Sequence, residues 1–183
     1  MKNIAILASG NGTNCDNIIR YFHNDSNIRV AMVLTNNPKA KVIEKARTQG
    51  VKVYIMAKEE FNDKEQLLPI LAENSIELIV LAGFLLFLPE FLVSAYPNGI
   101  INIHPSLLPA FRGAHAVEQA VEYGVKVYGI TIHYVNSELD GGRIIAQRAF
   151  EYDGDDPAEV HRLGQKIEHA LYVETISRLL NNK

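Results

Sequence analysis

The sequence predicts an α/β fold, built on an open twisted sheet that is mostly parallel, with antiparallel strands in its C-terminal half and helices on both faces. Short apolar runs alternate with helix-like stretches through the first half of the chain, which is typical of βαβ units. The runs 4–8 and 78–82 are apolar without interruption, as in strands covered by helices on both sides. Near the C-terminus, two strand-like runs flank the Gly-rich turn 140–142 and predict an antiparallel pair.

The expected elements follow one another regularly along the chain. Strands are expected at 3–8, 29–34, 51–55, 77–82 and 100–103, helices at 14–22, 40–49 and 63–73, and the antiparallel pair at 128–135 and 143–150. A last helix is expected from Asp155-Asp156-Pro157 to about Leu180, because aspartate caps helix N-termini and proline suits the first helical turn.

Length and composition favour one ordinary globular domain. The chain has 183 residues, of which 48% are hydrophobic and 21% charged, enough for one sizeable core and hardly enough for two.

The formal net charge is −3, whereas nucleic-acid binding usually requires a basic patch. We therefore expect no nucleic acid partner.

The sequence also predicts a cytoplasmic protein with no membrane association. Its longest apolar run, Leu78 to Leu88, ends at Pro89 and is well short of the roughly 18 residues that suggest a membrane span. The N-terminal apolar run is too short for a secretory signal. The single cysteine, Cys15, cannot form an internal disulfide.

Three polar segments are expected at one edge of the sheet. Ser9 to Asn14 follows the first strand, Gly83-Phe84 follows another, and Asn102 with His104 closes a third. In open α/β sheets, ligands bind beyond the carboxyl ends of the strands. This edge is therefore the expected site.

The glycine loop Ser9-Gly10-Asn11-Gly12-Thr13-Asn14 lies between a strand and a helix, so its N–H groups could hold an anion. An NAD site is rejected, because Cys15 replaces the third glycine and Thr35-Asn36-Asn37 replaces the acidic residue. A P-loop is rejected because no Gly-Lys-Ser/Thr follows. A single-phosphate site and a simple tight turn remain open.

Asn102, His104 and Asp140 are the candidate catalytic residues. The two-residue period of a strand places Asn102 and His104 on the same side. An amide N–H and an imidazole can together stabilise negative charge on a carbonyl oxygen. Asp140 could orient the imidazole, although a turn aspartate before glycine is the simpler interpretation. Metal ligation is the weaker alternative for these residues, and no metal is expected.

Nearly the whole chain resembles the phosphoribosylglycinamide (GAR) formyltransferases of purine synthesis. The segments that carry the resemblance are the glycine loop, Leu81-Ala82-Gly83-Phe84, Asn102-Ile103-His104-Pro105-Ser106-Leu107-Leu108-Pro109, Gly129 to His133, and Glu138-Leu139-Asp140-Gly141-Gly142. The resemblance implies a Rossmann-like formyltransferase fold over residues 1–183. Within it, residues 1–98 would bind the ribonucleotide, and residues 99–183 would bind folate and carry catalysis.

The resemblance implies roles for individual residues. The formyl group of 10-formyltetrahydrofolate, the co-substrate, would pass to the amine of GAR at Asn102, His104 and Asp140. The substrate phosphate would lie on Asn11, Gly12, Thr13 and Asn14, and Glu168 would contact the ribose hydroxyls. Against this, Glu168 could simply lie on a solvated helix face. Ser106 and Cys15 are interpreted as structural, and a homodimer is one option for the oligomeric state.

The resemblance places the folate against one set of residues: Leu81, Phe84, Leu86, Phe87, Leu88, Val135 and Asp140. Core packing would explain the apolar members equally well. Leu86 occupies a position where many relatives have arginine, which predicts a weaker dependence of affinity on the length of the folate's glutamate tail.

Other functions are less well supported. Methionyl-tRNA formyltransferases carry an additional RNA-binding domain, for which this chain has no length. Formyltetrahydrofolate hydrolases have a second histidine where this chain has Pro105. Sugar-amine formyltransferases and a non-catalytic folate- or nucleotide-binding module remain as alternatives.

Overall fold

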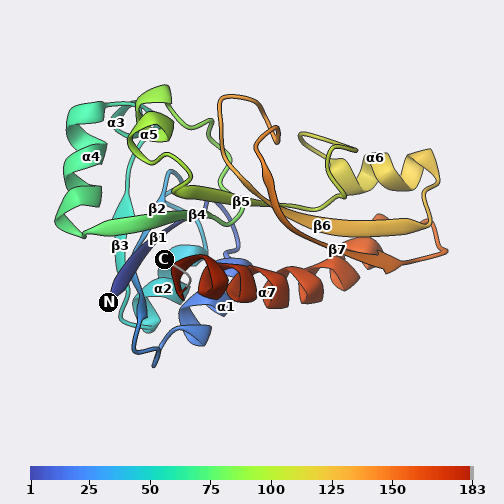
Figure 1. Cartoon of the computed structure of the whole chain (residues 1–183), viewed down its shortest axis with the longest axis horizontal. Coiled ribbons are helices and arrows are strands. Elements are labelled where there is room, and N and C mark those ends of the chain that lie inside the picture. Colours follow the sequence, from blue (N-terminus) through green and yellow to red (C-terminus); the bar gives the residue numbers. More distant parts are fainter. Residues whose placement is uncertain (182–183) are drawn as a thin grey trace.

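The computed structural model describes residues 1–181, which form one open sheet in the order β3-β2-β1-β4-β5-β6-β7 (Figure 1). Its strands are β1 (Lys2–Leu7), β2 (Ile28–Thr35), β3 (Lys52–Ile55), β4 (Ile76–Leu81), β5 (Ile100–His104), β6 (Val127–Tyr134) and β7 (Ile144–Glu151). The first five are parallel, and β6 and β7 are antiparallel to their neighbours. The predicted fold class is confirmed. The last two residues of the predicted domain, 182–183, lie outside the described residues.

Helices cover both faces of the sheet (Figure 1). On one face lie α1 (Thr13–Tyr21), α2 (Val42–Thr48) and the long α7 (Pro157–Asn181), which runs across several strands. On the other lie α3 (Lys58–Phe61), α4 (Lys64–Glu73) and α5 (Glu90–Ala95). The remaining helix, α6 (Ala116–Tyr123), packs through Val117 and Ala120 against β6 and α7.

The central strands contain continuous apolar runs because both of their faces are buried. In β1, Ile4 and Ile6 belong to the core beneath α1, α2 and α7, while Ala5 and Leu7 belong to the core beneath α3, α4 and α5. Because side chains alternate between the two faces of a strand, both sets must be apolar. Full burial of a large aliphatic side chain contributes roughly 1.5–3 kcal/mol, so these positions anchor the sheet.

Most predicted elements are confirmed to within one or two residues, while three short helices were missed. Helices α3, α5 and α6 have eight residues or fewer, too few for a clear helical period. The helix expected from residue 40 starts at Val42, because Ala40 N–H donates to the Asn37 carbonyl in a turn at 3.1 Å. Asp63 caps α4 by accepting the Glu65 N–H at 2.9 Å.

The strand order brings the predicted site segments together. Strand β1 lies between β2 and β4, so the direction of winding reverses between β1 and β4. Ligands of open α/β sheets bind at such a reversal. At the ends of these strands, Ser9 N–H donates to the Gly83 carbonyl at 3.0 Å, and Leu85 N–H donates to Ser9 Oγ at 3.0 Å. The glycine loop and the β4 end thus form one edge.

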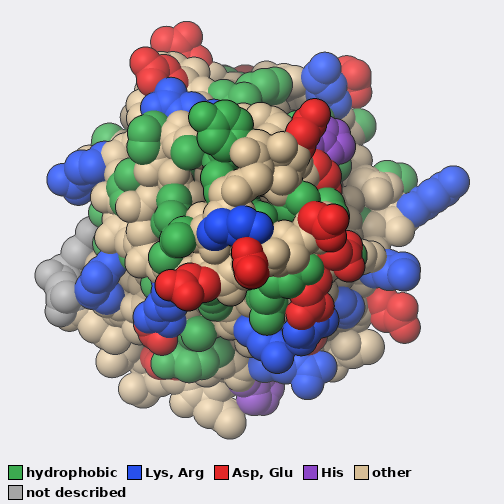
Figure 2. Space-filling model, turned by 90° about the vertical axis from the view of Figure 1, so that its right-hand side faces the viewer, with side chains coloured by type: hydrophobic (Ala, Val, Ile, Leu, Met, Phe, Trp, Pro, Cys, Tyr) green, Lys and Arg blue, Asp and Glu red, His purple; other side chains and the backbone are tan. Residues whose placement is uncertain are grey.

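The surface carries charge of both signs. Figure 2 shows acidic and basic side chains interspersed over the end of the molecule that it faces. Among residues 1–181, no helix is both long and apolar enough to cross a membrane.

Candidate active site

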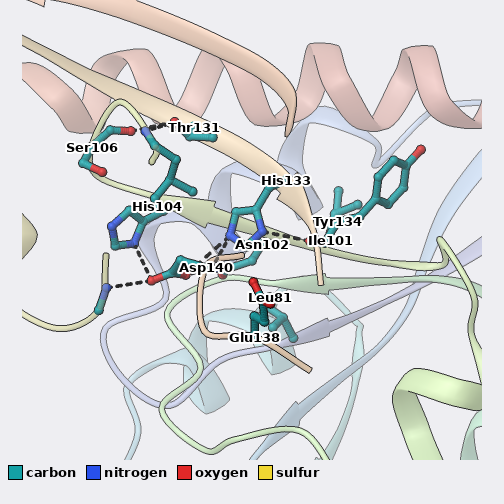
Figure 3. A network of polar contacts seen from close by, with 12 residues as sticks. Leu81, Ile101, Asn102, His104, Ser106, Thr131, His133, Tyr134, Glu138 and Asp140 are labelled. Carbon is teal, nitrogen blue, oxygen red and sulfur yellow. Dashed lines mark hydrogen bonds and ion pairs between the residues drawn. The ribbon is translucent and has the colours of Figure 1, made fainter. Parts of the chain in front are cut away.

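Three predicted residues from two segments converge at the end of β5 (Figure 3). Asn102 and His104 project from the same face of that strand, and Asp140 comes from the loop after β6. Asn102 Nδ2 donates to Asp140 Oδ1 at 3.4 Å, and His104 Nδ1 lies 3.4 Å from Asp140 Oδ2. The carboxylate therefore contacts both the amide and the imidazole.

Both ring nitrogens of His104 are engaged. The side chain is 6% exposed, and Nε2 lies 2.8 Å from the Phe111 carbonyl oxygen. A carbonyl only accepts hydrogen bonds, so Nε2 carries a proton. Nδ1 faces Asp140. A doubly protonated ring would therefore donate on both sides, to the carbonyl and to the carboxylate.

Asp140 is a buried carboxylate held by several donors. Its Oδ2 accepts the Gly113 N–H at 2.9 Å, and its backbone lies in the left-handed region with φ 48°, which aspartate tolerates better than most residues. The hydrogen bond from His133, foremost, then the Gly113 N–H and the charge of His104, lower the pKa of Asp140 to about 2. The carboxylate is therefore ionised at neutral pH.

His133 is a member of the site that the sequence interpretation missed. The antiparallel register of β5 and β6 pairs His133 with Asn102. Its Nε2 lies 3.3 Å from Asn102 Nδ2 and 3.5 Å from Asp140 Oδ1, while Nδ1 lies 2.9 Å from the Tyr134 carbonyl. One available signal was the alternation of Thr131 and His133 with apolar residues, which marks a polar strand face.

A cavity opens beside this network. The thirteen residues in its wall are Leu81, Phe84, Leu86, Phe87, Leu88, Asn102, His133, Val135, Asn136, Ser137, Glu138, Leu139 and Asp140. All seven residues expected to contact folate are among them. Phe87 remains 78% exposed at the rim. A flat aromatic ligand would cover such apolar surface while reaching Asn102.

The cavity wall has an unusual charge balance for a site expected to bind an anionic folate. It contains the carboxylates of Glu138 and Asp140 but, among the described residues, no lysine or arginine. Leu86, at the position where the resemblance implies arginine in many relatives, lies within this wall. An anionic tail would therefore find no cation there.

The glycine loop leads directly into α1. Gly12 caps this helix with φ 65°, and a Cβ at that position would collide with the Val42 side chain. Both the backbone conformation and the close approach therefore require glycine. The first N–H groups of α1, including those of Thr13 and Asn14, have no carbonyl of a preceding turn to bind. They form a suitable anion-binding edge.

Glu168 lies next to this loop, although it is 154 residues from Asn14 in sequence. Asn14 Nδ2 donates to Glu168 Oε2 at 2.7 Å. One helical turn later, the buried Tyr172 hydroxyl donates to the Leu81 carbonyl at 2.7 Å. Helix α7 is thereby fixed beneath the strand ends, with Glu168 half-buried beside the loop rather than on a solvated face.

Ser106 and Cys15 have contacts that support a structural interpretation. Ser106 Oγ donates to the Ala110 carbonyl at 2.7 Å. Cys15 is fully buried, and burial, with the neighbouring Asp16 charge, raises the pKa of its thiol to about 12. A thiol in this state is a poor nucleophile. Within residues 1–181, no cluster of His, Cys, Asp and Glu side chains has an arrangement suited to a metal ion.

The strand ends of this open α/β sheet present an amide, imidazoles and an ionised carboxylate beside a cavity, a set of groups able to stabilise a carbonyl oxygen and to move protons. Residues 2–176 match the formyl transferase family. The chain is 40% identical to the phosphoribosylglycinamide formyltransferase of Bacillus subtilis, covering 100% of this chain and 98% of that protein. It is 35% identical to the Escherichia coli protein of the same name, covering 96% and 85%.

Solved structures agree with this relationship. The phosphoribosylglycinamide formyltransferase of Anaplasma phagocytophilum superposes with a TM-score of 0.93 at 34% identity, covering 100% of this chain and 88% of that one. The Bacillus halodurans enzyme gives a TM-score of 0.89 at 40% identity, with 98% and 95% covered. The chain belongs to the formyl transferase family and, within it, to the phosphoribosylglycinamide formyltransferases.

Proposed function

We propose that this protein transfers the formyl group of 10-formyltetrahydrofolate to the amine of GAR, yielding formylglycinamide ribonucleotide and tetrahydrofolate in purine biosynthesis. The observation that carries the proposal is the convergence of Asn102, His104 and Asp140, with Asn102 and Asp140 forming part of the wall of a cavity that also presents apolar side chains. The cavity suits a folate ring, and the neighbouring glycine loop and Glu168 suit a ribose phosphate. No metal takes part in the proposed reaction.

The negative charge that develops on the formyl oxygen needs hydrogen-bond donors, and Asn102 supplies one. Its Nδ2 forms a nearly equilateral triangle with His133 Nε2 and Asp140 Oδ1, with sides of 3.3, 3.4 and 3.5 Å. An amide carries two diverging N–H bonds, and one of them donates to Asp140 Oδ1, to which His133 Nε2 also donates. The second N–H is then available to the formyl oxygen.

His104 would supply a second donor. Because Nε2 lies on the Phe111 carbonyl and Nδ1 faces Asp140, the ring must exchange one of these contacts for the formyl oxygen when substrates bind. Breaking a hydrogen bond to a neutral carbonyl costs less than breaking one to a carboxylate. Nε2 is therefore the nitrogen that we assign to substrate.

Asp140 would handle the proton of the reaction. When the amine attacks the formyl carbon, a new C–N bond forms and the bond to the folate N10 breaks. One proton must leave the amine, and one must reach N10. The ionised Asp140 can orient a water that passes the proton from the amine to the leaving nitrogen. His133 would hold Asn102 and Asp140 in place during these steps.

A transfer assay tests the proposal. Purified protein, GAR and 10-formyltetrahydrofolate are combined, and the formylated product is followed by mass, with Asp140→Asn and a reaction without acceptor as controls. We expect product only when GAR is present, and a loss of about a hundredfold to a thousandfold in the variant. Loss of formyl folate without acceptor would indicate a hydrolase, and no turnover would redirect the search to amino-sugar acceptors or to a binding module.

We also propose a cytoplasmic location, which the single cysteine supports. Light scattering during size-exclusion chromatography distinguishes a monomer from a homodimer.

A further inference from the structure

A short polar contact joins the glycine loop to helix α7. Asn14 Nδ2 donates to Glu168 Oε2 at 2.7 Å, and both side chains are half-buried. A hydrogen bond from an amide to a carboxylate is charge-assisted, and this one is at the short end of the usual range. It is one of the polar contacts between α1 and α7, which also include Gln165 Nε2 to Thr13 Oγ1 at 3.2 Å.

The orientation of the Asn14 amide is determined by this contact. Its Oδ1 is buried and, among residues 1–181, has no hydrogen-bond partner. A buried acceptor that is left unpaired is unfavourable. Turning the amide over would be worse, because its oxygen would then face the carboxylate of Glu168, and two acceptors repel. The Asn14 side chain is therefore committed to Glu168.

We propose that Asn14 is a positioning residue that holds Glu168 for the ribose hydroxyls of the acceptor, in addition to offering its backbone N–H to the phosphate. This inference rests on the proposed function. With Oε2 engaged by Asn14, Oε1 is the carboxylate oxygen that remains for the ribose. One residue thereby couples the phosphate and ribose subsites, so a movement of the glycine loop displaces the carboxylate as well.

A double-mutant cycle tests this coupling. The KM for GAR is measured in the wild-type enzyme, Asn14→Ala, Glu168→Ala and the double variant. We expect Asn14→Ala to raise this KM about tenfold, with kcat and the KM for the formyl folate within about twofold of wild type. In the Glu168→Ala background, Asn14→Ala should add less than twofold. Fully additive effects would overturn the proposal.

Two further measurements separate positioning from other roles. Inorganic phosphate, used as a competitive inhibitor, should keep its Ki in Asn14→Ala, because the backbone N–H remains; a Ki that rises with KM would assign the side chain to phosphate. The matched control is Gln165→Ala, which removes another contact between the same helices and should leave KM unchanged. An equal rise in the control would mean that general helix docking is responsible, and the proposal would fail.

Failure of the proposed function would give a different result. If the wild-type enzyme does not formylate GAR at all, the function is wrong, and the same cycle is measured by calorimetric binding of ribose 5-phosphate. Non-additive losses in that binding would still support the coupling, and additive losses would reject it. Circular dichroism and Tm of each variant establish that the fold is intact.

Discussion

Replacing Asp140 by asparagine removes the carboxylate around which the site is built, and its pKa predicts the effect on stability. The hydrogen bond from His133, foremost, together with the Gly113 N–H and the charge of His104, lowers this pKa from 3.8 to about 2. One pKa unit corresponds to about 1.4 kcal/mol. The full shift corresponds to about 2.5 kcal/mol, and after a discount for solvent screening the ionised carboxylate contributes roughly 2 kcal/mol to the free energy of unfolding at neutral pH.

The sign of the pH dependence follows from the direction of the shift. Because the pKa is lower in the folded state, the contribution is complete above about pH 5 and declines as the pH falls toward the folded-state pKa of about 2. Roughly 1 kcal/mol of it should be lost between pH 7 and pH 3, since acid protonates the unfolded chain first.

Urea unfolding at pH 7, 5 and 3, followed by circular dichroism, measures this contribution. The difference in unfolding free energy between the wild-type protein and Asp140→Asn should shrink by about 1 kcal/mol over that range. Asp153→Asn is the matched control, because Asp153 pairs with Lys126 in an exposed position and should show little change. A difference between wild type and Asp140→Asn that stays constant with pH would refute the reasoning.

Three further predictions concern single side chains. His133→Ala should lower kcat by about a hundredfold by releasing Asn102, while His133→Gln, whose amide can occupy the Nε2 position, should recover part of it; equal losses in the two variants would remove this role. The wild-type KM for 10-formyltetrahydrofolate should depend little on the number of tail glutamates. Leu86→Arg should introduce a several-fold preference for longer tails, whereas Leu86→Gln should not. A strong preference in the wild-type enzyme would contradict the argument that the cavity wall has no cation for the tail. Cys15 should react with iodoacetamide only after unfolding, because burial raises the pKa of its thiol to about 12. Mass spectrometry of native and denatured samples measures the labelling, and rapid labelling of the native protein would contradict the structural interpretation of Cys15.

Much of the fold was predictable because it depends on local periodicity. The apolar run at residues 4–8 identifies β1 as a central strand, since both of its faces are buried. The turn 140–142 identified the antiparallel pair, which the register of β6 and β7 confirms. The short helix α6 was missed because two turns carry too little periodic signal.

Site residues could be predicted only where reactive side chains lie close together in the sequence. Asn102 and His104 lie two residues apart, so the period of a strand is sufficient to place them on the same side. His133 was missed because its position depends on the register of β6 against β5, which pairs it with Asn102. A shift of one residue would turn it to the opposite face.

The sequence alone therefore determined the alternation of strands and helices, the glycine loop, and the identity of the amide, imidazole and carboxylate. The tertiary structure decided which groups touch: the placement of His133 beside Asn102, the engagement of His104 by the Phe111 carbonyl, and the contact between Asn14 and Glu168. The physical reason is that the two kinds of feature depend on interactions over different distances along the chain. Burial and backbone preference act over a few residues and leave a periodic pattern, whereas contacts between distant segments depend on strand register and loop path, for which the sequence has no local signal.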